Sequence, residues 1–219
     1  MLWTLLLVLL GAAAAAALYV GAAGAGPTST DLAVLSETLE LRSGGLTTVA
    51  VAVTEIGSTV SMAVLASLVA LWSLWRGRVV DAVLVFGAMV GAAAVFRGLK
   101  LVIDRPRPPV ADRLVEETNE SLPSGHATMS MVVIGILVVL AWPRLRAAAR
   151  AVLVAAAAGW VGAVGATRIY LGVHWFSDVL AGWLVGAAWL AAWVMAWSWW
   201  RRRGARSRNQ ADLAVTGPE

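Results

Sequence analysis

The chain alternates between long apolar runs and short polar segments, a pattern typical of proteins that cross a membrane several times. A helix needs about 20 apolar residues to span the hydrocarbon core of a bilayer. The apolar runs predict six spans, at residues 3–23, 58–75, 79–99, 126–142, 150–167 and 175–200. We therefore predict an all-α fold, an integral membrane six-helix bundle that forms one domain over residues 1–200.

Two of these apolar regions allow more than one interpretation. The first run ends in an Ala/Gly-rich stretch, residues 21–26, which also resembles a signal-peptide cleavage region, although no Lys or Arg precedes the run. The apolar region 46–75 is longer than one span needs, and Glu55 and Gly57 interrupt it. We interpret its first part, up to about Ile56, as an interfacial helix that precedes the second span.

The polar segments predict three loops on one side of the bundle and a tail on the other. Residues 27–45 indicate an extramembrane loop with a short helix, and residues 168–174 a short loop. Residues 101–125 indicate a long loop, in which prolines exclude a continuous helix. Residues 201–219 are expected to form a basic, disordered, cytoplasmic tail.

Composition supports the membrane assignment and removes one class of site. Hydrophobic residues make up 60% of the 219 residues and charged residues only 14%, whereas an ordinary soluble domain is about 45–50% apolar and about 25% charged. The chain contains no cysteine, which excludes both disulfides and thiolate metal sites. Lys100 is the only lysine among 17 basic residues.

The distribution of arginine predicts the orientation of the chain, because loops rich in Lys and Arg remain in the cytoplasm. Ten arginines fall in the two tight turns and the tail: Arg76, Arg78, Arg144, Arg146, Arg150, Arg201, Arg202, Arg203, Arg206 and Arg208. This side should be cytoplasmic. The loops at 27–57, 101–125 and 168–174 should then face the extracellular or periplasmic side.

Three outward segments carry the residues that could do chemistry. Lys100 and Arg107 end a span and enter a proline-stiffened loop, where they could clamp a phosphate, although basic residues at span ends also snorkel to the interface. Ser124 and Gly125 begin a helix whose free N–H groups could bind an anion, and His126 follows in its first turn. A capping role alone would explain Ser124 and Gly125.

The third segment contains Arg168, His174 and Asp178. Ionisable groups at membrane depth are costly, so they indicate a functional site. His174 and Asp178 are four residues apart, which places them on one helix face, where the carboxylate can accept a hydrogen bond from the ring. A histidine and an aspartate that only cap a helix at the interface are the structural alternative for this stretch.

A metal site is the chemical alternative, since His126, His174 and Asp178 could form a set of two histidines and one carboxylate. Three cations and a helix N-terminus at the same place would repel a divalent metal and attract an anion. We therefore expect an anion site without metal. Arg97, Asp104, Arg105 and the acidic run 116–120 could tune the choice of headgroup, but we expect them to be solvated loop residues or helix-end partners.

The order and spacing of these segments resemble the signature of the type 2 phosphatidic-acid phosphatase superfamily: K-x6-R-P, P-S-G-H and S-R-x5-H-x3-D. The chain reads Lys100 to Arg107-Pro108, Pro123 to His126, and Arg168 to His174 to Asp178. Thr167 stands where serine is commonest, and because it keeps a hydroxyl we expect little effect. The resemblance covers about residues 45–200 and includes the six-span layout.

The resemblance implies hydrolysis of a phosphoester or diphosphate without a metal or other cofactor. It implies that His174 attacks phosphorus to form a phosphohistidine, that Asp178 orients His174, and that His126 protonates the leaving group and then activates water. The residues implied to bind the phosphate are Lys100, Arg107, Ser124, Gly125 and Arg168. The two histidines need opposite protonation states, which predicts a bell-shaped pH profile.

The implied partners are the membrane and a lipid phosphate within it. We rank undecaprenyl diphosphate first, because that carrier is released on the outer side during wall assembly; phosphatidic acid and phosphatidylglycerophosphate are alternatives within the same chemistry. A lipid phosphotransferase with an alcohol or sugar acceptor is a second hypothesis. We expect no nucleic-acid partner, and the sequence does not set the oligomeric state.

A third hypothesis is a non-enzymatic membrane transporter or scaffold. A transporter should carry polar groups or broken helices near the bilayer midplane, whereas the predicted midplane segments here are almost entirely Ala, Val, Leu and Gly. Gly159, Gly162 and Gly165 suggest close helix packing instead.

Overall fold

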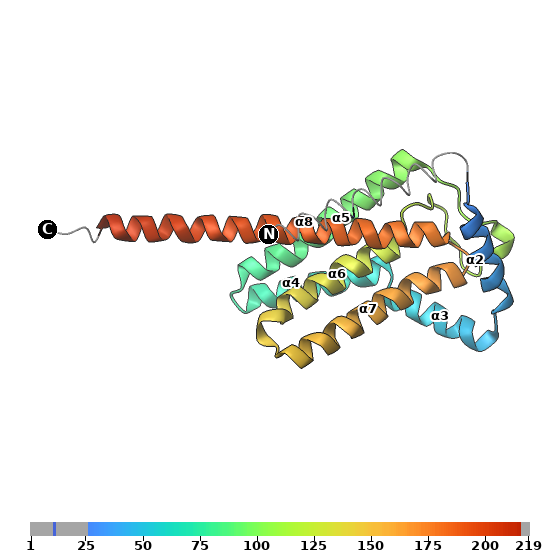
Figure 1. Cartoon of the computed structure of the whole chain (residues 1–219), viewed down its shortest axis with the longest axis horizontal. Helices are drawn as coiled ribbons and strands as arrows, with labels where there is room; N and C mark the ends of the chain where they lie inside the picture. Colours follow the sequence, from blue (N-terminus) through green and yellow to red (C-terminus); the bar gives the residue numbers. More distant parts are fainter. Residues whose placement is uncertain (1–10, 12–25, 216–219) are drawn as a thin grey trace.

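The structure, a computed structural model, describes residue 11 and residues 26–215, and every regular element in these ranges is helical. The elements are α2 (Ser29–Glu40), α3 (Gly44–Ile56), α4 (Thr59–Trp75), α5 (Val79–Ile103), η1 (Val110–Asp112), α6 (Gly125–Ala141), η2 (Trp142–Arg144), α7 (Ala147–Tyr170) and α8 (Phe176–Val215). The helices pack side by side as an elongated bundle, from which the C-terminal part of α8 projects (Figure 1).

Most of the predicted spans correspond to helices. Four segments are long and apolar enough to cross a membrane: α5, α6 with η2, α7, and α8 to Arg201. A fifth span would require α3 and α4 together, which are bent by 42° at Gly57–Ser58. The span expected at residues 3–23 lies outside the described residues. The described helices thus account for four or five of the six expected spans.

Two predicted boundaries were wrong. Arg168 lies in the last turn of α7 and not in a loop, because Ile169 and Tyr170 continue the helix, which ends at Tyr170, two residues before the left-handed Gly172. The expected disordered tail is helical as far as Val215, since the segment after Arg201 is rich in Arg and Ala, which favour helix. The short helix expected within residues 27–45 is α2.

The core of the bundle is centred on α6, which packs against α4, α5, α7 and α8. Met129, Val132, Val133 and Ile136 on α6 are buried among apolar residues of α4 and α5. Such a helix, apolar all round, belongs in the interior of a bundle. It therefore provides the fixed frame from which Ser124, Gly125 and His126 are presented at its N-terminal end.

Small residues set the spacing between α8 and its neighbours. The rings of Trp189 and Trp193 lie over Gly91 and Gly87 of α5, where any Cβ would collide with them. The two indole N–H groups donate to the carbonyls of Ala88 and Leu84 on α5, at 2.8 and 2.9 Å. Close approach combined with an interhelical hydrogen bond is how membrane helices associate without a hydrophobic driving force.

Only one of the three glycines of α7 that were expected to pack against a neighbouring helix does so among the described residues. Gly165 packs against Trp183 and Val179 of α8, but Gly159 and Gly162 face open space. These two positions do not serve helix packing among the described residues. Among the described residues, the close packing expected at these three glycines is present at Gly165 alone.

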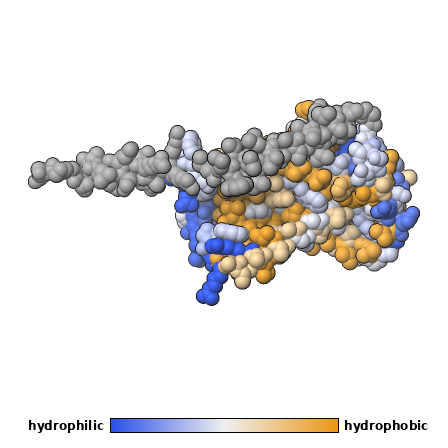
Figure 2. All heavy atoms as spheres, in the orientation of Figure 1, coloured by the Kyte–Doolittle hydropathy of each residue, from blue (hydrophilic) through white to orange (hydrophobic). Residues whose placement is uncertain are grey.

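Apolar residues gather over the middle of the visible face, and hydrophilic residues lie toward both ends (Figure 2). The tight turns at Arg76–Arg78 and Trp142–Arg146 lie at one end of the bundle, because each joins two antiparallel helices. The loops 104–124 and 171–175 lie at the opposite end, where the C-termini of α5 and α7 meet the N-termini of α6 and α8. The predicted site residues lie at this second end.

Candidate active site

A cavity of about 380 Å³ opens at the end of the bundle that carries the long loop. Its volume falls within the range of about 300–1,000 Å³ that is usual for small-molecule sites. It is bounded by the ends of α4, α5 and α6 and by the loops 104–124 and 171–175. The sequence-predicted residues that line it are Lys100, Arg107, Gly125, His126 and His174.

The turn before His174 is fixed by a glycine. Gly172 has φ +70°, in the left-handed region, and a Cβ there would collide with the Asp112 carbonyl and with Arg42. Glycine at this position ends α7 as a C-terminal cap does. The backbone N–H groups of Val173 and His174 then donate to the Arg168 carbonyl, at 3.2 and 3.3 Å. The turn thereby brings the buried His174 ring to the floor of the cavity.

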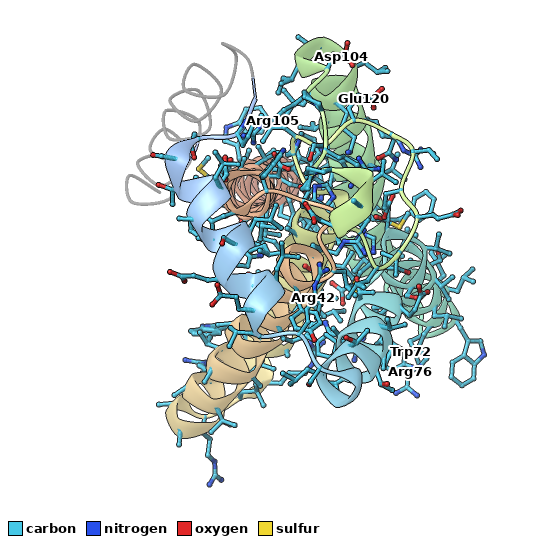
Figure 3. The ribbon with its side chains drawn as sticks, turned by 90° about the vertical axis from the view of Figure 1, so that its right-hand side faces the viewer. Arg42, Trp72, Arg76, Asp104, Arg105 and Glu120 are labelled. Atoms are coloured by element: carbon cyan, nitrogen blue, oxygen red, sulfur yellow. The ribbon has the colours of Figure 1, made fainter. Side chains whose placement is uncertain are left out.

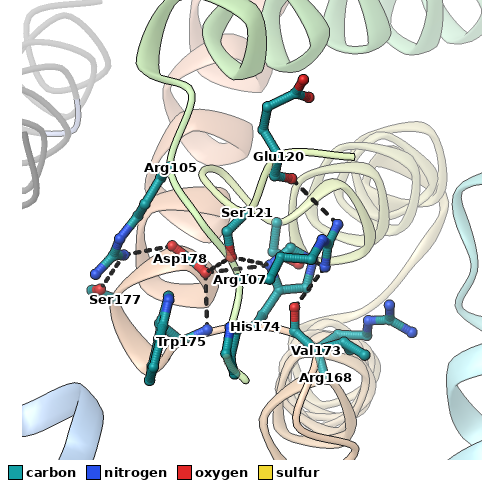
Figure 4. A network of polar contacts seen from close by, with 12 residues as sticks. Arg105, Arg107, Glu120, Ser121, Arg168, Val173, His174, Trp175, Ser177 and Asp178 are labelled. Carbon is teal, nitrogen blue, oxygen red and sulfur yellow. Dashed lines mark hydrogen bonds and ion pairs between the residues drawn. The ribbon is translucent and has the colours of Figure 1, made fainter. Parts of the chain in front are cut away.

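The two nitrogens of His174 have different partners (Figure 4). Nδ1 lies 3.4 Å from Oδ2 of Asp178 and 3.5 Å from Oγ of Ser121. Nε2 lies 3.1 Å from Nη1 of Arg107. A guanidinium only donates, so this contact assigns the lone pair to Nε2 and the proton of the neutral ring to Nδ1. The expected pairing of His174 with Asp178 is present in the structure.

The His174 ring has a lowered pKa, so it is neutral at neutral pH. The main cause is burial, since the side chain is only 2% exposed, and the positive charges of Arg107, Arg168 and Lys100 act in the same direction. A neutral ring with a free Nε2 lone pair is the protonation state that a nucleophile needs.

Asp178 is held from several directions in the first turn of α8. Its Oδ2 accepts a 2.9 Å hydrogen bond from the Trp175 N–H and another from the Ser121 hydroxyl. Its Oδ1 accepts a 2.6 Å hydrogen bond from Nη1 of Arg105. The carboxylate does not line the cavity and is fully buried behind His174, so it can act on the imidazole but not directly on a ligand.

Arg107 and Lys100 are held by the backbone and by Asn119. Arg107 donates to the carbonyl and the side-chain oxygen of Asn119, at 2.6 and 2.5 Å, and to the Val173 carbonyl at 2.5 Å. Lys100 donates to the Asn119 side chain at 3.3 Å and to the Glu120 carbonyl. Burial lowers the pKa of Arg107 to about 10, so this guanidinium remains a cation at neutral pH.

Arg168 reaches the site through Glu117. One of its Nη atoms donates to Thr54 Oγ1 at 2.8 Å, and the other is paired with the Glu117 carboxylate. The same carboxylate lies 3.7 Å from Arg107. Arg168 itself does not line the cavity, whereas Glu117 does. A carboxylate thus lies between two of the three cations that were predicted to bind phosphate.

The Pro-Ser-Gly-His stretch begins α6 as expected. The Ser124 hydroxyl caps the helix by accepting from the Ala127 N–H at 3.4 Å, but the Ser124 N–H donates to the Asp178 carbonyl and is not free for a ligand. The N–H groups of Gly125 and His126, in the first turn, have no acceptor within the helix. Gly125 packs under the Phe96 ring and beside Thr59, where a side chain would not fit without displacement.

The residues of the alternative metal site do not meet. Among the described residues, no group of three or more His, Asp or Glu side chains is placed to hold a metal ion. Asp178 contacts Nδ1 of His174 from behind the cavity, whereas His126 lines the cavity itself.

Four residues of the site were not predicted from sequence: Ser121, Asn119, Glu117 and Arg105. Arg105 and Glu117 were expected to be solvated, which was wrong, because Arg105 is buried in an ion-paired network and Glu117 pairs with Arg168. Asp104 is exposed and ends α5 with a left-handed φ of 49°, in agreement with a helix-end role. Thr167 donates its hydroxyl to the Val164 carbonyl within α7.

Comparison with known proteins gives one family and one fold. Residues 81–203 match the model of the PAP2 superfamily. The fold matches the crystal structure of a PAP2-type phosphatidylglycerolphosphate phosphatase from Bacillus subtilis, with a TM-score of 0.76, 25% identity, and coverage of 88% of this chain and 94% of that one.

A second solved structure, Aquifex aeolicus LpxE, matches with a TM-score of 0.60 at 20% identity, over 75% of this chain and 94% of that one, and supports the fold alone. No curated protein gives a significant match. The family model covers more than half of the chain and includes all three motif segments. The chain therefore belongs to the type 2 phosphatidic-acid phosphatase (PAP2) superfamily and is a membrane phosphoric ester hydrolase.

Proposed function

We propose that this protein hydrolyses the phosphate or diphosphate of a membrane lipid through a phosphohistidine formed on Nε2 of His174. The observation that carries the proposal is the environment of that ring. Nδ1 faces the buried Asp178 carboxylate, and Nε2 faces the cavity beside Arg107. This arrangement is that of a nucleophile oriented from behind by a carboxylate, with a cation placed where phosphate oxygens would lie.

In the first step the Nε2 lone pair attacks phosphorus, and the bond between phosphorus and the leaving lipid oxygen breaks. Asp178 stabilises the resulting imidazolium through Nδ1–H, as a carboxylate does beside other catalytic histidines. His126 gives its proton to the leaving oxygen, and the negative charge of the bound substrate stabilises that proton on the ring before transfer. Lys100, Arg107 and the first N–H groups of α6 stabilise the equatorial oxygens.

In the second step water attacks the phosphohistidine. His126, now neutral, accepts a proton from the water, the P–N bond breaks, and inorganic phosphate leaves with His174 restored. The Glu117 carboxylate is paired with Arg168 and lies near Arg107. The substrate phosphate must therefore displace this carboxylate from the arginines or bind them together with it. Arg168 then exchanges a carboxylate partner for a phosphate.

A groove beside the cavity supports a lipid substrate. An apolar groove of about 660 Å³ runs between α4 and α5, and it shares Thr59, Val60 and Arg97 with the lining of the cavity. An amphiphile whose phosphate enters the cavity can therefore leave its hydrocarbon chain along these helices. Arg97, at the junction, is placed to contact the headgroup.

The arginine distribution supports a site that opens on the outer side of the cell membrane, with the C-terminus in the cytoplasm. We therefore propose undecaprenyl diphosphate as the preferred substrate. The Bacillus subtilis relative is a phosphatidylglycerolphosphate phosphatase, which makes phosphatidylglycerophosphate and phosphatidic acid the alternatives. Transfer to an alcohol or sugar would need an acceptor in place of water, and a product other than inorganic phosphate would identify it.

The test is phosphate release by the purified protein from a panel of lipid phosphates and diphosphates in detergent, with EDTA present. We expect release in EDTA, fastest with undecaprenyl diphosphate, and none from the His174→Ala variant. Release that is equal in wild type and His174→Ala would indicate a contaminant and overturn the enzymatic proposal. Release that requires a divalent metal would overturn the metal-independent mechanism.

A further inference from the structure

Helix α2 is linked to Asp178 by a buried arginine from the long loop. Nη1 of Arg105 donates to Oδ1 of Asp178 at 2.6 Å and to the Ser177 hydroxyl at 2.8 Å. Nη2 donates to Oδ2 of Asp31 at 2.8 Å and to the Gly26 carbonyl at 3.2 Å. One guanidinium thus bridges a carboxylate of α2 and the carboxylate that contacts His174.

Asp31 is itself built into this network. Its Oδ1 accepts from the Ser177 N–H at 2.9 Å, and its Oδ2 accepts from the Ser177 hydroxyl at 2.8 Å and from the Thr28 N–H at 3.0 Å. Burial opposes ionisation of Asp31, but the bonds from Ser177, Thr28 and Arg105 outweigh it, so its pKa is lowered. Asp31 is therefore an ionised partner for Arg105.

The three side chains of this bridge are buried, so each charge needs a partner of opposite sign. The side chains of Arg105, Asp31 and Asp178 are 1%, 0% and 0% exposed. A buried charge that loses its partner is strongly destabilised, because it has neither water nor a counter-charge. Arg105 is shared between Asp178 and Asp31, so loss of Asp31 would leave Nη2 of the guanidinium without its carboxylate partner and free Arg105 to shift toward or away from Asp178.

The bridge also fixes how Asp178 is turned. The terminal torsion of an aspartate is broad and roughly two-fold, so a carboxylate held by one oxygen alone is poorly oriented. Arg105 holds Oδ1, while Oδ2 is directed to the Trp175 N–H, to Ser121 and toward Nδ1 of His174. Without Arg105, Oδ1 would have no partner among the described residues, and the carboxylate would be held through Oδ2 alone.

From this geometry we propose that Asp31 and Arg105 are positioning residues for the catalytic histidine, which makes α2 a part of the active site. The inference rests on the proposed function, in which Asp178 orients His174. Neither Asp31 nor Arg105 lines the cavity. Their loss should therefore lower kcat and leave KM nearly unchanged, since ground-state binding is made by other residues. Figure 3 shows Arg105 beside the start of α2 and Arg42 near its end.

The experiment compares wild type with Asp31→Asn, Arg105→Gln, Arg105→Lys and the double variant Asp31→Asn/Arg105→Gln. Steady-state kcat and KM and the single-turnover rate of phosphoenzyme formation are measured on the same lipid phosphate. We expect kcat and the phosphorylation rate to fall about 10-fold for Asp31→Asn and about 100-fold for Arg105→Gln, with KM within about two-fold. Arg105→Lys should lie between wild type and Arg105→Gln.

The double variant tests whether the residues act in series. If Asp31 acts only through Arg105, the double variant should be no slower than Arg105→Gln alone, which is a departure from additivity. Arg150→Gln is the matched control. Arg150 also donates to a backbone carbonyl, that of Trp142 at 3.1 Å, but it lies in the first turn of α7, at the opposite end of the bundle. Its kcat should stay within about two-fold of wild type.

The outcomes separate the two proposals. An inactive wild type, or an active His174→Ala, would overturn the proposed function and this inference with it. With an active wild type and an inactive His174→Ala, unchanged kcat in Asp31→Asn and Arg105→Lys would overturn the positioning role alone. A rise in KM at constant kcat would also overturn it, because Arg105 would then act on the substrate. Asp31→Asn is isosteric, so this variant carries the test even where Arg105→Gln does not fold.

Discussion

Nη1 of Arg107 lies 3.1 Å from Nε2 of His174, on the side of the ring that faces the cavity. This cation holds the lone pair that is proposed to attack phosphorus. A bound phosphate offers Arg107 stronger, charge-assisted hydrogen bonds. Substrate binding should therefore release the nucleophile and recruit its cationic partner at once, so that binding and activation are coupled.

The first prediction is that the phosphoenzyme carries its phosphoryl group on Nε2 of His174. Rapid quenching with labelled substrate should trap a phosphohistidine that is labile to acid and stable to base, and His174→Gln should trap none. Phosphorus NMR of the denatured protein distinguishes the two ring nitrogens. Attachment at Nδ1 would contradict the assignment, because Nδ1 faces Asp178.

His126→Ala is the informative companion of that experiment. The variant keeps the nucleophile but loses the group proposed to activate water. With a substrate whose leaving group needs no proton, phosphoenzyme should form and then accumulate. Rapid turnover in this variant would remove His126 from the second step.

The second prediction concerns the two side chains that hold the back of the imidazole. Asp178→Asn should lower kcat by about 10⁴, because an amide can stabilise the wrong tautomer of the ring. Ser121→Ala should cost about 10-fold, since Ser121 bonds Asp178 and lies 3.5 Å from Nδ1. Ser130→Ala is the matched control and should be near wild type, because this buried serine of α6 donates to the Ala127 carbonyl and has no other partner in the described part of the chain. Equal losses in the two serine variants would indicate a general packing effect.

The three motif segments could be recognised in the sequence alone, because their spacing and polarity stand out within apolar surroundings, and the family model covers all three. Lys100, Arg107, Gly125, His126 and His174 do line one cavity. Arg105 could not be recognised in the same way. A guanidinium in a proline-rich loop has the same sequence whether it is solvated or buried, and its partners Asp178 and Asp31 are 73 and 74 residues away.

Glu117 was missed for a related reason. An acidic run in a polar loop is normally solvated, and only the folded loop places one member of this run against Arg168. The helix boundary at Arg168 was also misplaced, because a polar residue at the end of an apolar run is compatible with both a last helical turn and a loop. Such errors arise where a tertiary contact, and not the local pattern, decides the position of a charge.

The third prediction is that the acidic limb of the pH profile of kcat/KM lies at low pH. The pKa of His174 is lowered by burial and by Arg107, Arg168 and Lys100. Its nucleophilic form therefore persists as pH falls through 6.5, and kcat/KM should fall only well below that value. Arg107→Gln removes one of these causes, so its acidic limb should move upward, toward 6.5. The full profile should be bell-shaped, since His126 must carry a proton, and a flat profile from pH 5 to 9 would contradict the pair.

The fourth prediction is that Glu117 competes with the phosphate. Its carboxylate is paired with Arg168 and lies 3.7 Å from Arg107. Glu117→Gln removes a negative charge from between two cations, so inorganic phosphate should inhibit the variant about 10-fold more strongly, with a parallel fall in KM. Glu116→Gln, an exposed neighbour in the same loop, is the control. Weaker phosphate inhibition in Glu117→Gln would mean that Glu117 mainly holds Arg168 in place.

The fifth prediction is that the site end of the bundle faces outward. The chain contains no cysteine, so single cysteines can be introduced and labelled in intact cells without background. Glu116→Cys in the long loop and Arg146→Cys in the turn before α7 are both exposed and lie at opposite ends of the bundle. A membrane-impermeant maleimide should label the first and reach the second only after lysis, because loops rich in arginine remain in the cytoplasm. The reverse pattern would place the site in the cytoplasm, and it would remove the reason for preferring undecaprenyl diphosphate over the other lipid phosphates.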